Sequence, residues 1–579
     1  MARNRNYQID KRWEIKQPGK VFTSDKFSED FIRLLTTRGI SSEAEALKFI
    51  NPKYEDLSDP LTIPDMNLAV ETIVKAVSKK EKIAIYGDYD VDGVTATALL
   101  CDFFHNVGVE TVPYIPSRAD EGYGLNIEAI ETLAKQDIKL IITVDCGSTS
   151  LDEIARANKL GMRVVVTDHH VLKVDAGKIV LPAAAAVINP KRLGLESPLY
   201  ELAGVAVAFY LIRALMTHFA DIYAVGQEKW LLDFVALGTI CDVVPLKGEN
   251  RILANWGLKV LAKSRRKGII ALAKAAEVNL DVVDSYKVGF LLGPRLNAAG
   301  RIEHALSALR LLLTDSHEEA EKLASDLDEL NKMRQELTER IVTEAKEFID
   351  KDGARQKIYL LSQKDWPAGV VGIVASRLAE EYGRPMLVME DLGAELKGSA
   401  RSIKNFNIIE ALAECGDLLS HYGGHAYAAG FRLSKDKFVL LNDKLIQISE
   451  DKIKATDLEP EISIDMEILN KNVIQKFLDE LTLLEPYGRE NGKPVFLIKG
   501  AKIADARLVG TPAVHLKLVI EQAGQTLAGI AFGYGEALDM IPGDIFDFVV
   551  TLDTNEWNNR KTPEFRLIDL KHADTVADK

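Results

Sequence analysis

The sequence predicts a multidomain α/β protein that ends in a small β-barrel. Three observations support this fold class. Short apolar runs alternate with helical stretches between residues 82 and 188, a long polar helix pattern covers residues 317–350, and short alternating strands separated by turn residues follow Pro460. Alternating strands and helices favour a parallel sheet, whereas closely spaced short strands favour a barrel.

The composition sets limits on the class of protein. At about 100–200 residues per domain, 579 residues predict three to five domains. A net charge of -14 argues against a protein that coats duplex DNA, because such binding depends on neutralising phosphates. It does not exclude an enzyme with a locally basic groove. The four cysteines show neither zinc-binding nor disulfide spacing, so reduced thiols are expected.

No apolar run approaches the length needed to span a bilayer. The first 20 residues are polar and charged, without an apolar stretch after the basic residues. We therefore expect no secretory signal, no membrane association and a cytoplasmic protein.

The N-terminal half is expected to contain a helical segment and a parallel-sheet domain. Residues 1–55 are expected to be helical, with a capped helix start at Ser42. Residues 56–315 form the expected sheet domain, whose second part, from about residue 202, has mostly helical periodicity. Its expected strands are buried apolar runs at residues 82–86, 111–115, 140–144, 163–167 and 184–188.

A long helix is expected at residues 316–352. Its apolar residues recur at steps of three and four, as Leu323, Leu327, Leu330, Met333, Leu337 and Ile341. A helix of this length would extend ~50 Å at about 1.5 Å per residue, which favours a rigid connection between domains. An ordinary surface helix of a large domain is the alternative.

The C-terminal half is expected to hold two further domains. A second α/β unit covers residues 353–455, with strands at 357–361, 386–389 and 399–401. Residues 456–579 are expected to form an OB-fold-like barrel, with strands at 495–499, 516–520, 545–552 and 565–569.

The strongest chemical signal is the segment 87–93, Gly-Asp-Tyr-Asp-Val-Asp-Gly, which follows an expected strand. Asp88, Asp90 and Asp92 would repel one another unless a strong positive partner, such as a divalent cation, lay between them. An EF-hand loop also has this spacing. However, the position of its bidentate Glu is taken by Leu99, and a strand rather than a helix enters the loop, so we exclude an EF-hand.

Further candidate ligands follow two other expected strands. Asp145 ends the run at 140–144, and Asp168, His169 and His170 end the run at 163–167. Asp242 lies in an apolar surround. Because ligands collect at the carboxyl ends of parallel strands, we expect these groups to meet.

Imidazole together with carboxylate suits Mn²⁺, Fe or Zn²⁺ better than calcium. Two metals bridged by a carboxylate suit phosphoester hydrolysis. His170 could hydrogen-bond the phosphate, protonate the leaving oxygen, or only orient a ligand.

Phosphate-binding candidates lie in segments rich in arginine and small residues. They are Arg118, Arg295 and Arg301 within the segment 293–301, Ser399 and Arg401 within 398–402, and His425. For each arginine alone, a solvated surface charge is the alternative.

Taken together, these motifs resemble a known family. Residues 168–170 with the upstream aspartates resemble the DHH phosphoesterase superfamily, and residues 398–402 and 423–430 resemble its DHH-associated domain. Residues 294–301, residues 372–378 and the C-terminal β-domain narrow the resemblance to the RecJ family of single-strand-specific exonucleases, over about residues 34–570. The resemblance implies a DHH domain, a connecting helix, a DHH-associated domain and an OB-fold-like domain.

The resemblance also implies a function. It implies 5′→3′ degradation of single-stranded DNA to mononucleotides with two Mn²⁺ or Mg²⁺ ions, in recombination and repair. It implies a monomer with a single-strand-binding protein and a recombination helicase as partners. By position, it implies catalytic roles for Asp88, Asp92 and His170, metal ligation by Asp90, Asp92, Asp145, His169 and Asp242, and DNA contacts from Arg118, Arg295, Arg301, Ser399, Arg401 and His425.

Two departures from the family pattern stand out. Trp366 is followed by Pro367 where the family often has histidine, and Asn491 is followed by Gly492 where the family usually has proline. Two rival functions remain: a DHH phosphodiesterase for very short or cyclic oligonucleotides, and a catalytically inactive scaffold at a replication fork.

A strand-binding barrel could use aromatic platforms, because bases stack on aromatic rings. The candidates are Phe532, Tyr534 and Trp557, for which burial in the core is the alternative.

Overall fold

The computed structural model describes residues 11–118, 121–122, 124–510, 514–535, 540, 542–557 and 560–573, without the side chains of residues 556, 557 and 560. It divides into two compact units. The larger unit is Tyr54–Glu459, and the smaller one joins Pro460–Lys579 to the N-terminal Met1–Lys53. The N-terminal segment thus packs with the C-terminal region rather than standing alone.

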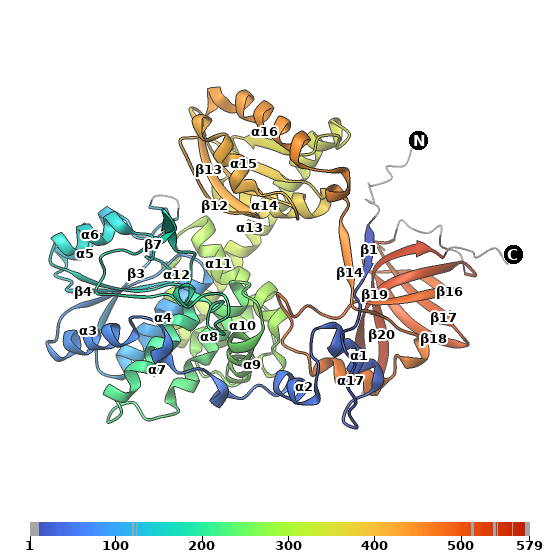
Figure 1. Ribbon diagram of the computed structural model, residues 1–579, viewed down its shortest axis with the longest axis horizontal. Coiled ribbons are helices and arrows are strands. Elements are labelled where there is room, and N and C mark those ends of the chain that lie inside the picture. The colour runs from blue at the N-terminus through green and yellow to red at the C-terminus, as the bar shows by residue number, and fades with distance from the viewer. Residues whose placement is uncertain are drawn as a thin grey trace. The chain divides into compact units, whose positions relative to one another are not determined.

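The larger unit begins with a parallel sheet of five strands in the order β3-β2-β4-β5-β8. Figure 1 labels two of these strands, β3 and β4. The strands are β2 (Ile83–Tyr86), β3 (Thr111–Tyr114), β4 (Leu140–Val144), β5 (Arg163–Thr167) and β8 (Ala186–Ile188). Each expected strand is present, within two residues at either end. β2, β4 and β8 are buried along their whole length, as is β5 after Arg163, because helices cover both faces.

Two helical layers enclose this sheet. The helices α3 (Met66–Ser78), α4 (Val91–Asn106) and α7 (Gly204–Leu215) cover one face, and α5 (Ile127–Lys135) and α6 (Leu151–Lys159) cover the other. β2 has β3 on one side and β4 on the other, so the strand order reverses between β2 and β4. Such a reversal leaves a crevice at the carboxyl ends of the strands, where ligands bind in open α/β sheets.

The rest of this first α/β domain is helical, as expected. It contains α8 (Leu232–Cys241), α9 (Gly248–Leu261), α10 (Lys267–Ala275), a π-helical turn η7 (Lys287–Leu292), α11 (Gly293–Ile302) and α12 (Leu306–Leu313). These helices share one apolar core with α3, α4 and α7.

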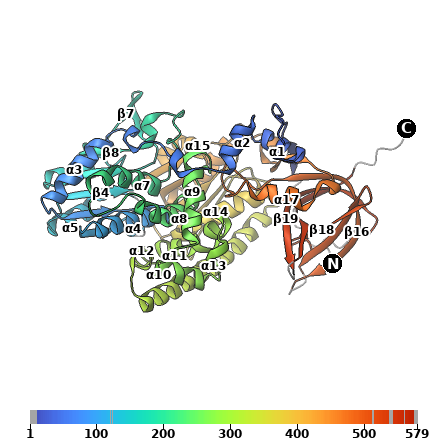
Figure 2. The same cartoon turned by 90° about the horizontal axis from the view of Figure 1, so that it is seen from below.

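The expected long helix is present as α13 (His317–Lys351, 35 residues), and Ser316 caps its first turn by accepting from the amide of Glu319. Its two ends lie in different cores. Leu323, Leu327 and Leu330 join the core of the first domain, while Ile341 and Ile349 join a core with α14 (Ala368–Tyr382). Met333, between these stretches, is 51% exposed. Figure 2 shows α13 beside α10, α11 and α14.

A second α/β domain follows α13. Its sheet has the order β12-β13-β11-β10-β9. The strands are β9 (Tyr359–Gln363), β10 (Met386–Asp391), β11 (Glu395–Arg401), β12 (His421–His425) and β13 (Ala428–Ser434). The helices α15 (Ile408–Glu414) and α16 (Phe438–Lys452) pack on one face. β12 and β13 are not among the expected strands, because their glycines and exposed polar residues do not resemble a buried strand.

The smaller unit contains the expected barrel. The strands β16 (Phe496–Val509), β17 (His515–Gln522), β18 (Gln525–Ala531), β20 (Arg560–His572) and β19 (Ile545–Trp557) pair in this order. An additional pairing between β16 and β19 closes the sheet into a barrel of five strands, and all four expected strands lie within it.

Other segments pack around the barrel. The strand β14 (Glu461–Ile464), the short β15 (Met466–Glu467) and the helix α17 (Gln475–Thr482) precede β16. The remaining expectations for this unit were only partly correct. The N-terminal segment contains α1 (Glu29–Thr37) and α2 (Glu43–Ile50), but it begins with the strand β1 (Arg12–Ile15), which pairs with β14.

The aromatic candidates for base stacking on the barrel differ in their exposure to solvent. Phe532 is 52% exposed, Tyr534 is partly buried, and the side chain of Trp557 lies outside the described part.

Two further observations concern the cysteines and the apolarity of the helices. All four cysteines are free, and three of them are buried. Among the described residues, none of the helices combines the length and apolarity needed to cross a bilayer.

Candidate metal centre

The loop that follows β2 turns sharply into α4. Asp90 is the N-cap of α4, and its Oδ1 accepts from the amides of Asp92 and Gly93 at 2.9 and 3.1 Å. A Cβ on Gly93 would lie 2.5 Å from the backbone of Asp88, so only glycine allows this turn. Oδ1 of Asp88 is buried and accepts no hydrogen bond from the described residues.

Asp92 is fully buried under the N-terminus of α7. Its carboxylate accepts from the amides of Gly204 and Val205 at 2.6 and 2.8 Å. A helix N-terminus favours negative charge, so α7 stabilises this carboxylate from the side opposite the loop. Gly238 of α8 also approaches it, since a Cβ there would lie 2.8 Å from Oδ1 of Asp92.

Asp145 follows β4 and adopts a left-handed backbone conformation, with φ of 60°. Non-glycine residues in this region carry strain, which proteins tolerate mainly at functional sites. Asp145 is buried, and a Cβ on Gly204 would lie 2.7 Å from its Oδ1.

The segment after β5 presents two imidazoles, and Asp168 holds it in place. Oδ1 of Asp168 accepts from the amide of His169 at 2.7 Å and lies 2.8 Å from Nδ1 of His170, while Oδ2 accepts from the amide of Ser148. Asn189, which follows β8, donates to the carbonyl of His170 at 3.0 Å. Asp168 therefore orients the histidines instead of pointing into the cluster.

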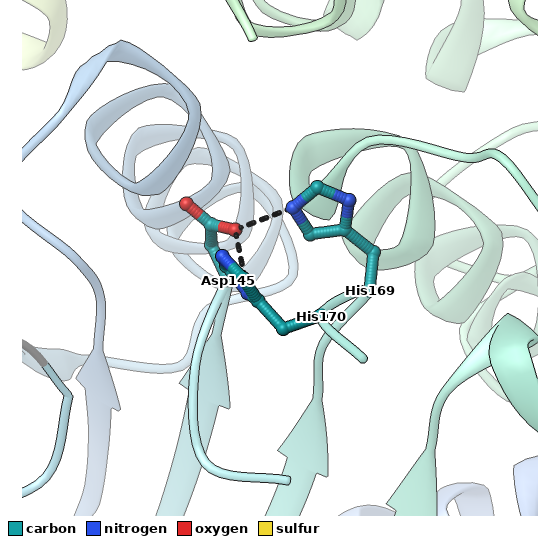
Figure 3. Close-up of side chains that lie close together, drawn as sticks. All are labelled: Asp145, His169 and His170. Carbon is teal, nitrogen blue, oxygen red and sulfur yellow. Dashed lines mark ion pairs between the residues drawn. The ribbon is translucent and has the colours of Figure 1, made fainter. Parts of the chain in front are cut away.

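The candidate ligands converge at the reversal point of the sheet. Nε2 of His169 lies 3.0 Å from Oδ1 of Asp145 (Figure 3). It also lies 3.7 Å from carboxylate oxygens of Asp92 and Asp242. Nδ1 of His170 lies 3.8 Å from Oδ1 of Asp145. Three groups have ligand atoms within 4.8 Å of one another: Asp145 with His169 and His170, Asp92 with His169 and Asp242, and Asp88 with Asp90 and Asp145.

The surroundings of this cluster disfavour the ionised form of its carboxylates. Burial, followed by repulsion from Asp90, raises the pKa of Asp92 to about 7 and that of Asp88 well above its usual range. Burial and four neighbouring aspartates raise the pKa of Asp145 likewise. These aspartates crowd together without a matching number of basic side chains, so ionising them together requires another positive charge.

The two histidines differ in protonation. Burial, and then the charge of His170, lower the pKa of His169 to about 3, so His169 is neutral and offers a lone pair. Burial also opposes the charged form of His170, but the hydrogen bond and the charge of Asp168 outweigh it and raise the pKa of His170 to about 9. The same pairing holds the pKa of Asp168 below its usual range, although burial acts to raise it.

These features fit divalent cations. Nε2 of His169 and Oδ1 of Asp88 are buried atoms without hydrogen-bond partners among the described residues, as ligand atoms would be. A donor set of carboxylates with neutral imidazole matches Mn²⁺ or Mg²⁺ chemistry with Mn²⁺ favoured by the imidazole. Asp145 and His169 each belong to two of the groups, which suits a site for more than one ion.

Gly204→Ala is expected to impair the site without unfolding the domain. The added methyl group would lie 2.7 Å from Asp145 and would push it out of the cluster. We expect a loss of Mn²⁺ affinity of about 10–100-fold, as for other changes that displace a ligand. Isothermal titration with Mn²⁺ measures it.

Gly289→Ala is the matched control for this prediction. Its added Cβ would have Ile240 as its nearest neighbour, at 3.8 Å, which is ordinary contact. Equal Mn²⁺ affinity in the two variants would contradict the crowding argument.

Three of the predicted phosphate-binding arginines gather between the two α/β domains of the larger unit. Arg118 stacks on the ring of Tyr89, 5.1 Å from its centroid. Arg301 donates to the carbonyl of Gly369 at 3.1 Å, and Arg401 donates to Oγ of Ser376 at 3.0 Å. Burial lowers the pKa of Arg301 and of Arg401, and the charge of Arg118 lowers both further.

The other predicted contacts are placed differently. Arg295 forms an ion pair with Asp328 at 2.8 Å, so its charge is already balanced inside the domain. Ser399 lies on the same strand as Arg401 and faces Gly372 of α14, whereas His425 ends the exposed edge strand β12. Arg118, Arg301, Arg401 and Ser399 therefore remain the strongest candidates for phosphate contacts.

Several residues that build the site are not among the candidates predicted from sequence. Asn297 of α11 accepts from the amide of Val91 at 3.1 Å and so fixes the start of α4. The amides of Gly204 and Val205, which hold Asp92, and the side chain of Asn189, which holds the carbonyl of His170, were not among the candidates either. Only Asn297 lies in a segment, 293–301, that the sequence analysis singled out.

Comparisons with known proteins agree with this architecture. Residues 82–239 match the N-terminal domain of the DHH family, residues 355–451 match the DHHA1 domain, and residues 464–569 match the RecJ OB domain. The single-stranded-DNA-specific exonuclease RecJ of Bacillus subtilis is 37% identical, over 96% of this chain and 70% of that protein. RecJ of Escherichia coli is 36% identical, over 87% of this chain and 89% of that protein.

Solved structures give the same result. The crystal structure of RecJ from Thermus thermophilus in complex with Mn²⁺ has a TM-score of 0.83 at 28% identity, and covers 97% of this chain and 79% of that chain. The Mg²⁺ complex of the same protein has a TM-score of 0.77.

Proposed function

The chain belongs to the RecJ family, and from this membership we propose that it is a single-strand-specific 5′→3′ exodeoxyribonuclease that releases 5′-mononucleotides. The observation that carries the proposal is the meeting of five aspartates and two histidines beside the ends of neighbouring strands, with Asp145 and His169 each shared between groups. We propose that the enzyme acts in DNA recombination and repair.

The residues that would hold two Mn²⁺ or Mg²⁺ ions are Asp90, Asp92, Asp145, His169 and Asp242, with Asp88 beside them. When bound, such ions supply positive charge for the reacting phosphate and activate the attacking water. The chain's contribution is rigidity: α7 fixes Asp92, the strained backbone fixes Asp145, and Asp168 fixes the histidines. Ligands already in place need not reorganise during the reaction.

His170 is the proposed proton donor or phosphate contact. It is partly exposed, unlike Asp168 beneath it, and its raised pKa keeps it protonated near neutral pH. A charged imidazole at this place can hydrogen-bond a phosphate oxygen or protonate the leaving 3′ oxygen. Asp168, which does not face the cluster, would act through His170 as a positioning residue.

The 5′ end is proposed to bind between the two α/β domains. Arg118 extends from the first domain, while Ser399 and Arg401 come from β11 of the second, and the charge of Arg118 acts directly on Arg401. Guanidinium groups and a hydroxyl suit a terminal phosphate. The charge of Asp90 acts on Arg301, which is proposed to contact the scissile phosphate.

The proposal is tested with strands labelled at either end, in the presence of Mn²⁺. We expect single strands to be degraded to mononucleotides, with the 5′ label released first, and blunt duplexes to be degraded at least about 100-fold more slowly. Degradation of both forms at similar rates would exclude strand specificity, and early release of a 3′ label would reverse the proposed polarity.

The rival functions give different outcomes. A phosphodiesterase for very short oligonucleotides would prefer dinucleotides to long strands in a substrate-length series. An inactive scaffold would bind single strands and hydrolyse none of them. The closed barrel in the smaller unit favours the exonuclease, because barrels of this class commonly bind single strands through stacking and basic groups.

Several further statements belong to the proposal. We propose domain boundaries at residues 56–315, 316–352, 353–455 and 456–579, which contain the family matches. Single-stranded DNA is the proposed substrate, and a single-strand-binding protein and a recombination helicase are the proposed partners of a monomer in the cytoplasm. Sedimentation of the purified protein, alone and with each partner, tests the monomer and the associations.

A further inference from the structure

One face of the sheet in the second α/β domain is only partly covered by helices. On the other face, residues of β11 and β13 such as Leu396 and Phe431 are buried in the core with α15 and α16. Successive side chains of a strand point to opposite faces, so Lys397, Ser399 and Arg401 share the first face. The helix α14 packs on this face over β10 and β11.

Over β13 and β12 the same face is open to solvent. Gly430 and Arg432 of β13 are exposed, as are all five residues of β12. A Cβ on Gly423 or on Gly430 would meet no atom within 4 Å. Gly423 lies opposite Gly430, and Gly430 lies opposite Ser399. The two glycines therefore form a flat, open floor beside a residue that is proposed to bind the terminal phosphate.

A row of basic side chains crosses this face two residues earlier on β11. Lys397 lies directly opposite Arg432 of β13, and Arg432 lies opposite His421 of β12. Directly opposite residues have Cβ atoms about 4.5–5.5 Å apart, and like charges in this relation destabilise a sheet. Lys397 is partly buried, and its ammonium group has neither an ion-pair nor a hydrogen-bond partner in the described part of the chain. A bound anion would stabilise such an arrangement.

The two nearest carboxylates have other partners. Glu395 lies 3.8 Å from Arg432, at the limit of an ion pair, and also accepts from the hydroxyl of Ser420. Glu390 lies opposite Lys397 on β10, but its carboxylate accepts from the first amide of α14 at 2.9 Å. Burial, and then the charge of Arg432, lower the pKa of Lys397, and together they outweigh the attraction of Glu390.

The position of the basic row relative to the proposed DNA contacts limits what it can bind. Lys397 precedes Ser399 by two residues, which separates them by about 7 Å at 3.3–3.4 Å per residue. In the proposed function, the terminal 5′ phosphate lies at Ser399 and Arg401, and the strand then leaves this sheet for the metal cluster of the first domain. The anions that remain for the basic row are those attached to the terminal phosphate itself.

We propose that Lys397 and Arg432 bind the β and γ phosphates of a 5′-triphosphate, so that the enzyme accepts single strands with a triphosphorylated 5′ end. This proposal rests on the proposed function, because Ser399 and Arg401 set the position of the first phosphate. Additional phosphate oxygens suit additional ammonium and guanidinium groups. Strands that a polymerase begins from a nucleoside triphosphate, without a primer, carry such an end.

The reaction on such a strand differs from the proposed hydrolysis only in its first product. Water adds to the phosphorus of the first internucleotide phosphate, the bond from this phosphorus to the 3′ oxygen breaks, and the 3′ oxygen takes up a proton. The first nucleotide leaves as a nucleoside 5′-triphosphate with a 3′ hydroxyl, and the remaining strand keeps a 5′ monophosphate. No bond within the triphosphate breaks.

The test compares one oligodeoxynucleotide with a 5′ monophosphate or a 5′ triphosphate, in the presence of Mn²⁺. From the triphosphorylated strand, the parent protein should release a nucleoside triphosphate first, with kcat/KM at least equal to that on the other strand. For Lys397→Gln we expect kcat/KM to fall about tenfold on the triphosphorylated strand, as for loss of one charge-assisted hydrogen bond, and less than about twofold on the monophosphorylated strand. Lys397→Arg should recover part of the loss, because it keeps the charge.

Lys444→Gln is the matched control in the same domain. Lys444 belongs to α16, which packs on the opposite face of the sheet, and it pairs with Asp417 at 3.0 Å. It should leave both strands unaffected. Equal losses on the two strands in Lys397→Gln would assign Lys397 to the terminal or an internal phosphate, and no loss on either would show a solvated surface charge. Both results would overturn the proposal, as would a parent protein that degrades only the monophosphorylated strand.

Binding without metal gives an independent measurement and separates the two proposals. In EDTA, the fluorescence anisotropy of oligonucleotides labelled at the 3′ end gives the affinity for each 5′ end. The parent protein should bind the triphosphorylated strand about tenfold more tightly, and Lys397→Gln should remove this preference. A parent protein that cleaves no strand refutes the nuclease function, whereas equal affinities for the two ends refute the triphosphate site even if the nuclease function stands.

Discussion

Asp145→Asn is expected to lower the rate of single-strand hydrolysis by at least about 10³-fold. Asp145 belongs to two of the three ligand groups, so the substitution weakens both at once. Loss of several kcal/mol of charge stabilisation in the transition state corresponds to this factor. Hydrolysis of a labelled oligonucleotide with saturating Mn²⁺ measures the effect.

The same variant should be more stable than the parent in the absence of metal. Burial and four neighbouring aspartates raise the pKa of Asp145, so the neutral amide removes repulsion. A higher melting temperature in EDTA, together with lost activity, would separate a functional defect from misfolding.

Asp137→Asn is the control for Asp145→Asn. Asp137 shares the aspartate chemistry and the positive φ of Asp145, but its side chain is 70% exposed and pairs with Lys139. It should retain full activity. Normal hydrolysis by Asp145→Asn would contradict the assignment of Asp145 as a ligand of the proposed metal centre.

Removal of divalent ions is expected to abolish hydrolysis and to make stability depend on pH. Burial and Asp90 raise the pKa of Asp92 from 3.8 to about 7 in the metal-free protein. A group with a higher pKa in the folded state contributes stability that is complete below its unfolded pKa and disappears as pH rises through its folded pKa. The melting temperature in EDTA should therefore fall by several degrees between about pH 4 and pH 7.

Mn²⁺ should reverse this trend. An ion that binds the ionised carboxylates stabilises the folded state by about 2.7 kcal/mol at 100 times its dissociation constant, and it binds more strongly as pH rises. Thermal melts across this pH range, with EDTA or with Mn²⁺, measure both effects. A metal-free protein whose stability rises from pH 4 to pH 7 would contradict the assigned shift for Asp92.

Much of the first domain could be predicted from sequence for a clear physical reason. Strands buried on both faces, such as β4 and β5, are continuous apolar runs, and a polar residue directly after such a run marks the edge where ligands collect. The convergence of Asp88, Asp145 and His169 follows from this pattern, although their role as ligands stays a prediction.

Other features depend on contacts between distant parts of the chain. β1 pairs with β14, and Arg12 lies opposite Glu461, which no local pattern in the first 55 residues indicates. The motif of Asp168, His169 and His170 does not show which residues face the cluster, because only the fold directs Asp168 toward backbone amides.

The continuity of α13 has a mechanical consequence. Since one uninterrupted helix is anchored in both cores of the larger unit, the separation between the metal-bearing loops and β11 is set by a count of residues at about 1.5 Å each. A single inserted residue would also rotate the second α/β domain by about 100° relative to the first. Changes in the length of this helix are therefore far more restricted than changes in a loop, because the helix fixes the spacing of the two domains that it joins.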